Sequence, residues 1–451
     1  MRDLLIIIIF LAVGAMALKR PWIGVMLWTW ISLMNPHRYA YGFSYFMPIA
    51  MLSVLVTLIG FFNTNDRQSP FKGAPVVILL FLFIWITISW KLGIDPSLDY
   101  ALWDKVMKIY FMIFITLALL NNRYQILAFV WVCAFSLALL GAKGGLFTIM
   151  TGGDHRVWGP PGSFIGGNNE FALALIMIVP LLYFLKLQTK SKWLGYGLLF
   201  TMLLCTAAAL GSQSRGALVA LIAMGSMFWW RSPKKGQIGI LILVVGLAMI
   251  PMMPESWFDR MQTIETYEED ASAMGRINAW VVGFEVAKHR FFGAGMGYLY
   301  PELFAAYAPY DNNPVVAHSI YFQMLGNHGF VGLGLFLLLY FFTYRTAGWL
   351  RKEGAKIPEA KWTADLGAMV QVGLVGYATG GAFLSLNYFD LPLSMMVMVV
   401  VARKWVETKG WETDPKMTFL EYVGFKRKDG KPVQRTSGKA MRQNRQPPPR
   451  R

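Results

Sequence analysis

Residues 74–90 read APVVILLFLFIWITISW and contain no charged side chain. A predominantly apolar run of about 20 residues is long enough to cross a bilayer as a helix. Similar runs lie at 4–18, 21–35, 46–62, 105–120, 124–141, 170–186, 193–210, 216–230, 237–251, 318–344, 365–384 and 389–403. The sequence therefore predicts an all-α, polytopic integral membrane protein with about 12–13 transmembrane helices.

The composition agrees with this prediction. Of the 451 residues, 56% are hydrophobic and 15% are charged, and the mean hydropathy is +0.45. Soluble domains carry about 25% charged residues, so these values exclude a soluble globular enzyme and a disordered protein. The 17 tryptophans and 19 tyrosines suit the membrane interfaces, where both residue types concentrate.

Positive charge indicates which side of the membrane each loop faces. The formal net charge is +17, and the tail 403–451 has 14 Lys and Arg against 5 Asp and Glu. Cytoplasmic segments are enriched in Lys and Arg. We therefore expect this tail in the cytoplasm, near anionic lipid and not nucleic acid, together with 186–192, 231–235 and 345–361. The side of the N-terminus stays open.

The other loops should lie on the opposite face, which would be the periplasm of a Gram-negative cell. They are 142–169, 211–215, 252–317 and 385–390. The loop 252–317 is acidic, with 9 Asp and Glu against 4 Lys and Arg. Within it, 276–290 has apolar residues at helical spacing, which predicts an amphipathic helix on the membrane surface. These residues are Ile277, Trp280, Val281, Phe284 and Ala287.

We divide the chain into three parts on this basis. Residues 1–141 hold N-terminal transmembrane helices. Residues 142–402 form a membrane core that includes the loop 252–317. Residues 403–451 form a basic tail, and its polar, Pro-containing end 436–451 is expected to be disordered.

Two arginines on the predicted periplasmic face could bind an anion. Charged groups are costly beside a bilayer, so Arg215 and Arg276 are functional candidates, and both break the charge rule. A guanidinium group binds phosphate in a bidentate manner, and helix N-termini attract anions. Arg215, with its neighbour Ser214, and Arg276 therefore suit a diphosphate. Alternatively, each arginine caps a loop or pairs with an acid between Glu265 and Asp270.

A histidine on the same face could act as a base. His318 lies at the start of the run 318–344. A neutral imidazole can take a proton from a hydroxyl group. The alternative is a structural histidine that bonds a loop carbonyl. We expect His289 and His328 to be structural.

The loop before the run 170–186 reads DHRVWGPPGSFIGGNNE (154–170). Such an aromatic and then glycine-rich loop could line a sugar site. Trp158 would stack on a sugar ring, Asn168 and Asn169 would bond hydroxyls, and Arg156 would add a cation. A simple turn that caps the following helix explains the same residues equally well.

Several other chemistries are not indicated. Cys133 and Cys205 lie inside apolar runs, so neither a disulfide framework nor a cysteine metal site is expected. No pair of histidines at helical spacing with a carboxylate is present. The chain also lacks a Walker loop, a Rossmann fingerprint and a nucleophile elbow. We expect no metal and no cofactor.

Four stretches, in this order, resemble the O-antigen ligase and O-antigen polymerase superfamily. They are PPGSFIGGNNEFAL (160–173), SQSRGALVAL (212–221), GRINAWVVGFEVAKHRFFGAGMGY (275–298) and AHSIYFQMLGNHGFVGLGLF (317–336). The stretch LKRPWIGVMLWTWISLMNPHRY (18–39) resembles the exosortase-associated O-glycosylation ligase variant.

The resemblance implies a C-type glycosyltransferase fold with its site at the periplasmic face of the inner membrane. It implies an undecaprenyl-diphosphate-linked glycan as donor and a sugar hydroxyl of lipid A–core as acceptor. Carried over by motif, Arg215 and Arg276 would hold the diphosphate. His318 would act on the acceptor hydroxyl in an inverting, metal-independent transfer. The expected function is that of an O-antigen ligase.

Two alternatives stay open. The first is an O-antigen polymerase, or a ligase that glycosylates protein, with the same lipid-linked donor. The second is a transporter of lipid-linked sugar, which fits less well. Transporters usually place ionisable residues near the bilayer midplane within repeated halves, and no repeat is visible here.

Overall fold

The computed structural model describes residues 2–231, 235–249, 271–416, 421 and 422. Helices account for 77% of the structure, and the described residues contain no strand. The predicted all-α class is therefore confirmed. The α-helices are α1 (Arg2–Lys19), α2 (Pro21–Met34), α3 (Ile49–Asn63), α4 (Ala74–Lys91), α5 (Tyr100–Leu119), α6 (Arg123–Met150), α7 (Asn168–Gln188), α8 (Lys192–Gly211), α9 (Arg215–Arg231), α10 (Lys235–Met249), α12 (Ala271–His289), α13 (Pro301–Tyr307), α14 (Ile320–Glu353), α15 (Lys361–Gly381), α16 (Asp390–Glu407) and α17 (Gly410–Thr413). Short 3₁₀ turns are η1 (Pro36–Tyr39), η2 (Phe43–Tyr45), η4 (Gly354–Lys356) and η5 (Pro358–Ala360).

Several helices are long and apolar enough to cross a membrane. Among the described residues, five meet this condition by length and composition: α4, α6, α7, α8 and the stretch Ile320–Lys356. Two shorter helices, α2 and α3, are also apolar. The chain is thus a polytopic membrane protein, and the total of 12–13 spans stays a prediction.

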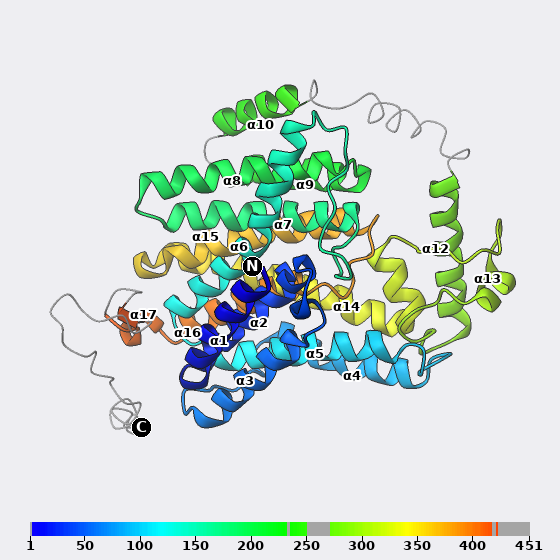
Figure 1. Ribbon diagram of the computed structural model, residues 1–451, viewed down its shortest axis with the longest axis horizontal. Helices are drawn as coiled ribbons and strands as arrows, with labels where there is room; N and C mark the ends of the chain where they lie inside the picture. Colours follow the sequence, from blue (N-terminus) through cyan, green and yellow to red (C-terminus); the bar gives the residue numbers. More distant parts are fainter. Residues whose placement is uncertain (1, 232–234, 250–270, 417–420, 423–451) are drawn as a thin grey trace, which may run out of the picture.

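The bundle is built around α7 and α16. Figure 1 shows α7, α8 and α15 side by side, and α7 also packs against α6 and α9. Nearly every side chain of α7 from Phe171 to Leu185 is buried, as is α16 from Asp390 to Val399. A helix that is apolar on all faces belongs in such a centre. Both helices therefore serve as the core against which the others pack.

The longest helix, α14, is interrupted at Gly329. This residue has φ 67° and ψ −173°, which is not helical and which glycine adopts with little cost. A Cβ at Gly329 would lie 2.4 Å from the carbonyl oxygen of Phe291, so the neighbouring backbone needs a glycine there. We expected one continuous helix over 318–344. The structure corrects this to two helical pieces with a bend between them.

Two further expectations need correction. We expected a loop to begin at residue 142, but α6 continues to Met150. The helix predicted at 276–290 is present as α12, yet its buried face is Ala279, Val282 and Val286, which pack with Tyr298 and Phe304. Phe284, from the predicted apolar stripe, is 41% exposed. Packing against α14 and α13 decides the buried face.

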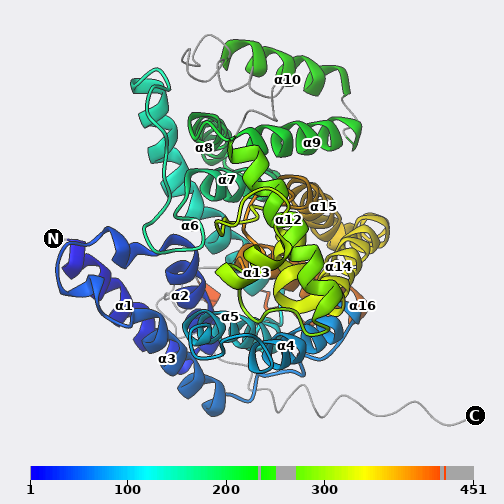
Figure 2. The same cartoon turned by 90° about the vertical axis from the view of Figure 1, so that its right-hand side faces the viewer.

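The helix α12 runs across the direction of the long helices. Figure 1 shows it upright at one edge of the molecule with α13 beside it, and Figure 2 shows both in front of the bundle when that edge faces the viewer. This orientation agrees with a helix that lies along a membrane surface. No membrane accompanies the structure, so the surface location stays a prediction.

Parts of four predicted segments lie outside the described residues. These are 232–234 of the basic segment 231–235, 250–251 of the run 237–251, 252–270 of the long loop with the acids from Glu265 to Asp270, and 417–420 with 423–451 of the basic tail. The expected disorder of 436–451 therefore stays a prediction.

Candidate active site

Two of the loops predicted to be periplasmic are joined by hydrogen bonds. The side-chain amide of Gln213 donates to the carbonyl oxygen of Gly153 over 3.1 Å. The Arg156 guanidinium donates through Nε to Oε1 of Gln213 over 3.2 Å. The N–H of Val157 donates to the carbonyl oxygen of Gly211 over 3.3 Å. The loop after α6 thus brings Arg156 next to the segment 212–215.

The start of α7 is tied to the same segment. Asn168 is 8% exposed, and its side-chain amide donates to the carbonyl oxygen of Ser212 over 2.8 Å. The Ser214 hydroxyl oxygen accepts a hydrogen bond from the N–H of Ala217 over 3.2 Å and so caps the first turn of α9. Arg215 is the first residue of α9 and is half-buried. Asn168 and Ser214 therefore hold the backbone that carries Arg215.

His318 lies beside a carboxylate. Its Nδ1 is 3.8 Å from Oε1 of Glu170, and the two side chains are 33% and 13% exposed. This separation is longer than a hydrogen bond, and Nδ1 has no hydrogen-bond partner among the described residues. A carboxylate in this position can stabilise the imidazolium that forms when the ring takes up a proton.

The backbone at His318 is unusual. The helix α14 begins at Ile320, two residues later than expected, and His318 has φ 45°, in the left-handed region. The preceding carbonyl oxygen, of Ala317, accepts a hydrogen bond from Nε1 of Trp280 over 2.7 Å. Trp280 belongs to α12 and lies about one turn after Arg276, which is half-buried.

These contacts join four elements into one group. The segment 212–215 contacts the start of α7, the start of α7 contacts the segment 317–318, and that segment contacts α12. The structure therefore gathers the elements that carry Arg215, Glu170, His318 and Arg276. Their roles in a reaction stay proposals.

The other predicted sugar-binding residues differ in accessibility. The indole of Trp158 is 59% exposed, which leaves its face open for stacking. Asn169 is half-buried and Arg156 is exposed. Because Asn168 and Ser214 already make hydrogen bonds inside the protein, their contribution to a site is chiefly to position their neighbours.

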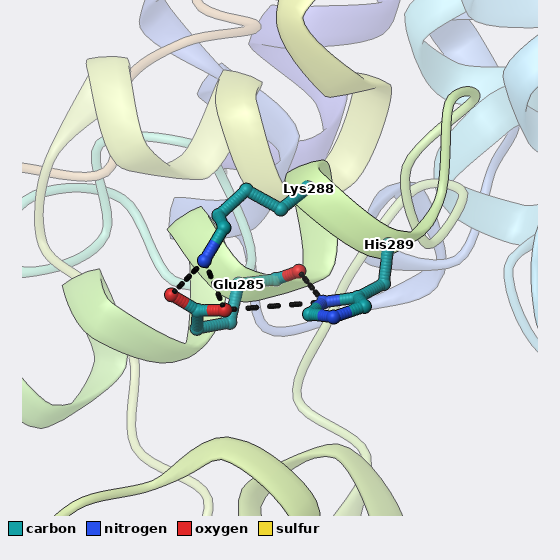
Figure 3. Close-up of polar contacts among 3 residues, drawn as sticks. All are labelled: Glu285, Lys288 and His289. Atoms are coloured by element: carbon teal, nitrogen blue, oxygen red, sulfur yellow. Dashed lines mark hydrogen bonds and ion pairs between the residues drawn. The ribbon is translucent and has the colours of Figure 1, made fainter.

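Two other histidines have different surroundings. Figure 3 shows His289 beside Glu285 and Lys288 on the last turn of α12. Its Nδ1 is 2.8 Å from the Glu285 carbonyl oxygen and 3.8 Å from the Glu285 carboxylate, and the ring stacks on Tyr307.

His328 is fully buried at the bend of α14. Its two ring nitrogens lie 2.8 Å from Oγ of Ser89 and 2.6 Å from the hydroxyl of Tyr388. Both ring nitrogens are therefore used within the protein, as a structural histidine requires.

Glu170 was missed at the sequence level because an acid in the first turn of a helix is ordinarily explained by the helix dipole. One signal was available. Glu170 is the only acidic residue between Asp154 and Glu255, and an isolated charge in an apolar region is a functional candidate. In the structure, a Cβ at Gly167 would lie 2.1 Å from Oε2 of Glu170, so the glycine leaves room for this carboxylate.

The described residues contain no group of three or more His, Cys, Asp or Glu that could hold a metal ion. The exclusion of a metal from the reaction stays a prediction.

Two stretches of the chain match known families. Residues 200–337 match the family described as O-antigen ligase, and residues 1–190 match a family of unknown function (DUF5935). No curated protein matches the chain. The fold, with its long apolar helices, defines a polytopic helical membrane protein. The match over 200–337, which contains Arg215, Arg276 and His318, supports the predicted resemblance to the O-antigen ligase superfamily.

Proposed function

We propose that the protein is an O-antigen ligase of the C-type glycosyltransferase architecture. It would transfer a glycan from undecaprenyl diphosphate to a sugar hydroxyl of lipid A–core, at the periplasmic face of the inner membrane. The observation that carries this proposal is the pairing of His318 with Glu170 beside the segment of Arg215. That pairing places a candidate base beside the start of α7, which is hydrogen-bonded to the segment that carries Arg215.

The two arginines have the chemistry that a diphosphate requires. In the transfer, the bond between the anomeric carbon and the diphosphate oxygen breaks, and negative charge grows on the departing undecaprenyl diphosphate. Guanidinium groups stabilise such a charge with bidentate hydrogen bonds. Arg215 at the start of α9 and Arg276 on α12 would hold the diphosphate from two elements.

The histidine would act on the acceptor. The acceptor hydroxyl oxygen attacks the anomeric carbon from the side opposite the diphosphate, which inverts the configuration, and its proton passes to His318. A positioned base of this kind typically contributes 10²–10⁴-fold to the rate. Glu170 would orient the ring and stabilise the imidazolium. The proton then leaves to solvent, and the histidine is restored.

The loop 154–170 would contribute to glycan binding. Trp158 offers an exposed indole face to a sugar ring, and Arg156 and Asn169 lie in the same loop. This loop belongs to the stretch matched by the family of unknown function, and it contacts the stretch matched by the ligase family. Both parts of the chain would therefore be needed for the reaction.

A reconstituted reaction tests the proposal. Purified protein in detergent is mixed with an undecaprenyl-diphosphate-linked glycan and with one of three acceptors: lipid A–core, an unglycosylated protein, or a second donor molecule. We expect glycan-modified lipid A–core and free undecaprenyl diphosphate. Elongated donor would indicate a polymerase, and glycosylated protein would indicate a protein ligase. No covalent product in any reaction would contradict an enzymatic role and favour a transporter.

A further inference from the structure

A cavity of about 520 Å³ lies among the N-terminal helices, apart from the candidate active site. It is bounded by the end of α2, the start of α3, the first turns of α5 and the start of α16. Phe164 and Ile165, from the loop 154–170, line one side. None of Arg215, Arg276 and His318 lines it. The cavity and the candidate active site therefore share one loop and no catalytic candidate.

The cavity has more cations than acids. Arg38, Lys105 and Lys108 line it with two acids, Asp104 and Asp390. Lys108 and Asp104 form an ion pair at 2.5 Å, and Asp390 accepts a hydrogen bond from Ser32 over 2.5 Å. Among the described residues, no carboxylate lies within 4 Å of Arg38 or Lys105. Asp390, the second acid of the lining, lies in no ion pair within 4 Å among the described residues.

The surroundings of Arg38 and Lys105 suit an additional anion. Each cation packs over one aromatic ring: Arg38 over Tyr45 at 5.1 Å and Lys105 over Phe164 at 3.9 Å. Within the described part of the chain, neither charged group makes a hydrogen bond to these rings. Nδ1 of His37 also lines this region, is buried, and has no hydrogen-bond partner among the described residues. Burial of a polar atom without a hydrogen-bond partner costs free energy, and a ligand that bonds to Nδ1 of His37 would remove this cost.

The rest of the wall is apolar. Trp28 and Ile31 from α2 and Ile49 from α3 line the cavity, and all three are buried. A site with cations at one part and apolar side chains along the remainder fits an amphiphile with an anionic head group. Phosphate suits the pair Arg38 and Lys105 best, because guanidinium and ammonium groups both bind it with charge-assisted hydrogen bonds.

We propose that this cavity binds a phosphate group carried by an acylated glycolipid, which is the acceptor substrate of the transfer reaction. This inference rests on the proposed function. The loop 154–170 connects the two sites, since it places Phe164 in the cavity and Glu170 beside His318. A lipid anchored by its phosphate at Arg38 would extend its sugars along this loop toward the histidine.

Equilibrium binding to the purified protein, without donor, tests the inference. The probes are diphosphorylated lipid A, the same lipid without its phosphates, phosphatidylglycerol, and inorganic phosphate. We expect diphosphorylated lipid A to bind most tightly. Arg38→Gln and Lys105→Gln should each weaken its binding about tenfold or more, to near the level of the dephosphorylated lipid. Lys143→Gln is the matched control, because Lys143 lies over Tyr39 outside the cavity. The affinity of this variant for diphosphorylated lipid A should be unchanged.

A variant with the opposite expected effect separates a lost contact from misfolding. Asp104→Asn releases Lys108 from its ion pair and should tighten the binding of diphosphorylated lipid A. Wild-type affinity in both Arg38→Gln and Lys105→Gln would overturn the inference. Phosphatidylglycerol or inorganic phosphate binding as tightly as lipid A would overturn the substrate assignment. If binding depends on Arg38 but no transfer occurs, the proposed function fails and the lipid site stands.

Discussion

The backbone of His318 lies in the left-handed region, at φ 45°. A residue other than glycine costs about 1–2 kcal/mol in this conformation, so the surroundings must hold it there. Trp280 does so from α12 by a hydrogen bond to the preceding carbonyl, while Glu170 stands 3.8 Å from the ring. The position of the imidazole is thus defined by three separate segments, as a catalytic base requires.

Removal of the Glu170 charge should slow the reaction. Glu170→Gln keeps the shape but loses the charge that would stabilise the imidazolium, so we expect at least a tenfold lower transfer rate with little change in donor affinity. Glu285→Gln is the matched control, because Glu285 lies at the same 3.8 Å from His289. Equal rates for the two variants, measured as initial velocities, would remove Glu170 from the mechanism.

Substitution of Arg215 or Arg276 should lower activity more than substitution of an arginine elsewhere in the protein. Loss of a charge-assisted contact costs about 1.5–3 kcal/mol, so Arg215→Ala and Arg276→Ala should each lower activity at least tenfold. Arg215→Lys should restore only part of it, because lysine lacks the planar fork. Arg345→Ala, exposed at the distant end of α14, serves as the control. Full activity in both alanine variants, at normal expression, would contradict the assignment.

The residues of the site could be predicted from sequence only in part. Arg215, Arg276 and His318 are predicted site residues because their charge and motif stand out against apolar neighbours, and their roles stay proposals. The contacts that organise them were not visible, because Asn168 reaches Ser212 across 44 positions and His318 reaches Glu170 across a still longer stretch of chain. Such contacts depend on how the helices pack, and no local pattern encodes them.

At the scale of single elements, glycine decides the shape of α14. The apolar run 318–344 predicts one continuous helix, although two glycines and two polar residues interrupt it at 326–329. The close approach of the Phe291 carbonyl and the positive φ together require glycine at this position. The bend also places Asn327 where its amide donates to the carbonyl oxygen of Met296.

Gly329→Ala should therefore destabilise the protein. The side chain would meet the Phe291 carbonyl oxygen and oppose the positive φ, which together cost about 1–3 kcal/mol or more. We expect a lower thermal unfolding temperature in detergent. Gly334→Ala, in the same helix with nothing within 4 Å of its Cβ, should leave the temperature unchanged or raise it. Equal unfolding temperatures for the two variants would contradict strain from a side chain at Gly329.

The helix α12 shows a different limit of prediction. Its periodicity indicated a helix correctly, but apolar residues occur on more than one face, so the pattern could not select the buried one. Val282 and Val286 face the core, whereas Phe284 stays largely exposed. The partner surface, made by α13 and α14, comes from sequence further along the chain.

At the scale of the whole molecule, the charged loops sort to two ends. One end carries the group around His318. At the other, Arg231 donates to the Tyr344 hydroxyl over 2.9 Å and Gln188 donates to Asp365 over 3.2 Å, so the basic segments 186–192 and 231–235 bond residues that flank 345–361. The apolar runs were sufficient to predict the all-α membrane class, and the assignment of the loops to two membrane faces stays a prediction. The order of packing around α7 and α16 was not predictable, because nearly all faces of these helices are apolar.

Cysteine labelling tests which end faces the periplasm. Ala306→Cys, exposed on α13, should react with a membrane-impermeant maleimide in intact cells whose outer membrane has been permeabilised. Ala355→Cys, exposed after α14, should react only after the inner membrane is opened. The native Cys133 and Cys205 are buried and should add little background. The reverse labelling pattern would place the site in the cytoplasm.

The most direct test of the central claim is the initial rate of glycan transfer to lipid A–core by purified protein in EDTA. Wild type, His318→Ala and His289→Ala are compared, since both histidines lie 3.8 Å from a glutamate carboxylate. Only the partner of His318, Glu170, belongs to the start of α7 that is hydrogen-bonded to the segment of Arg215. We predict an active wild type, an active His289→Ala protein, and a His318→Ala protein slowed about 10²–10⁴-fold. Transfer by His318→Ala near the wild-type rate, or a wild type that stops in EDTA, would contradict a metal-independent reaction with His318 as its base.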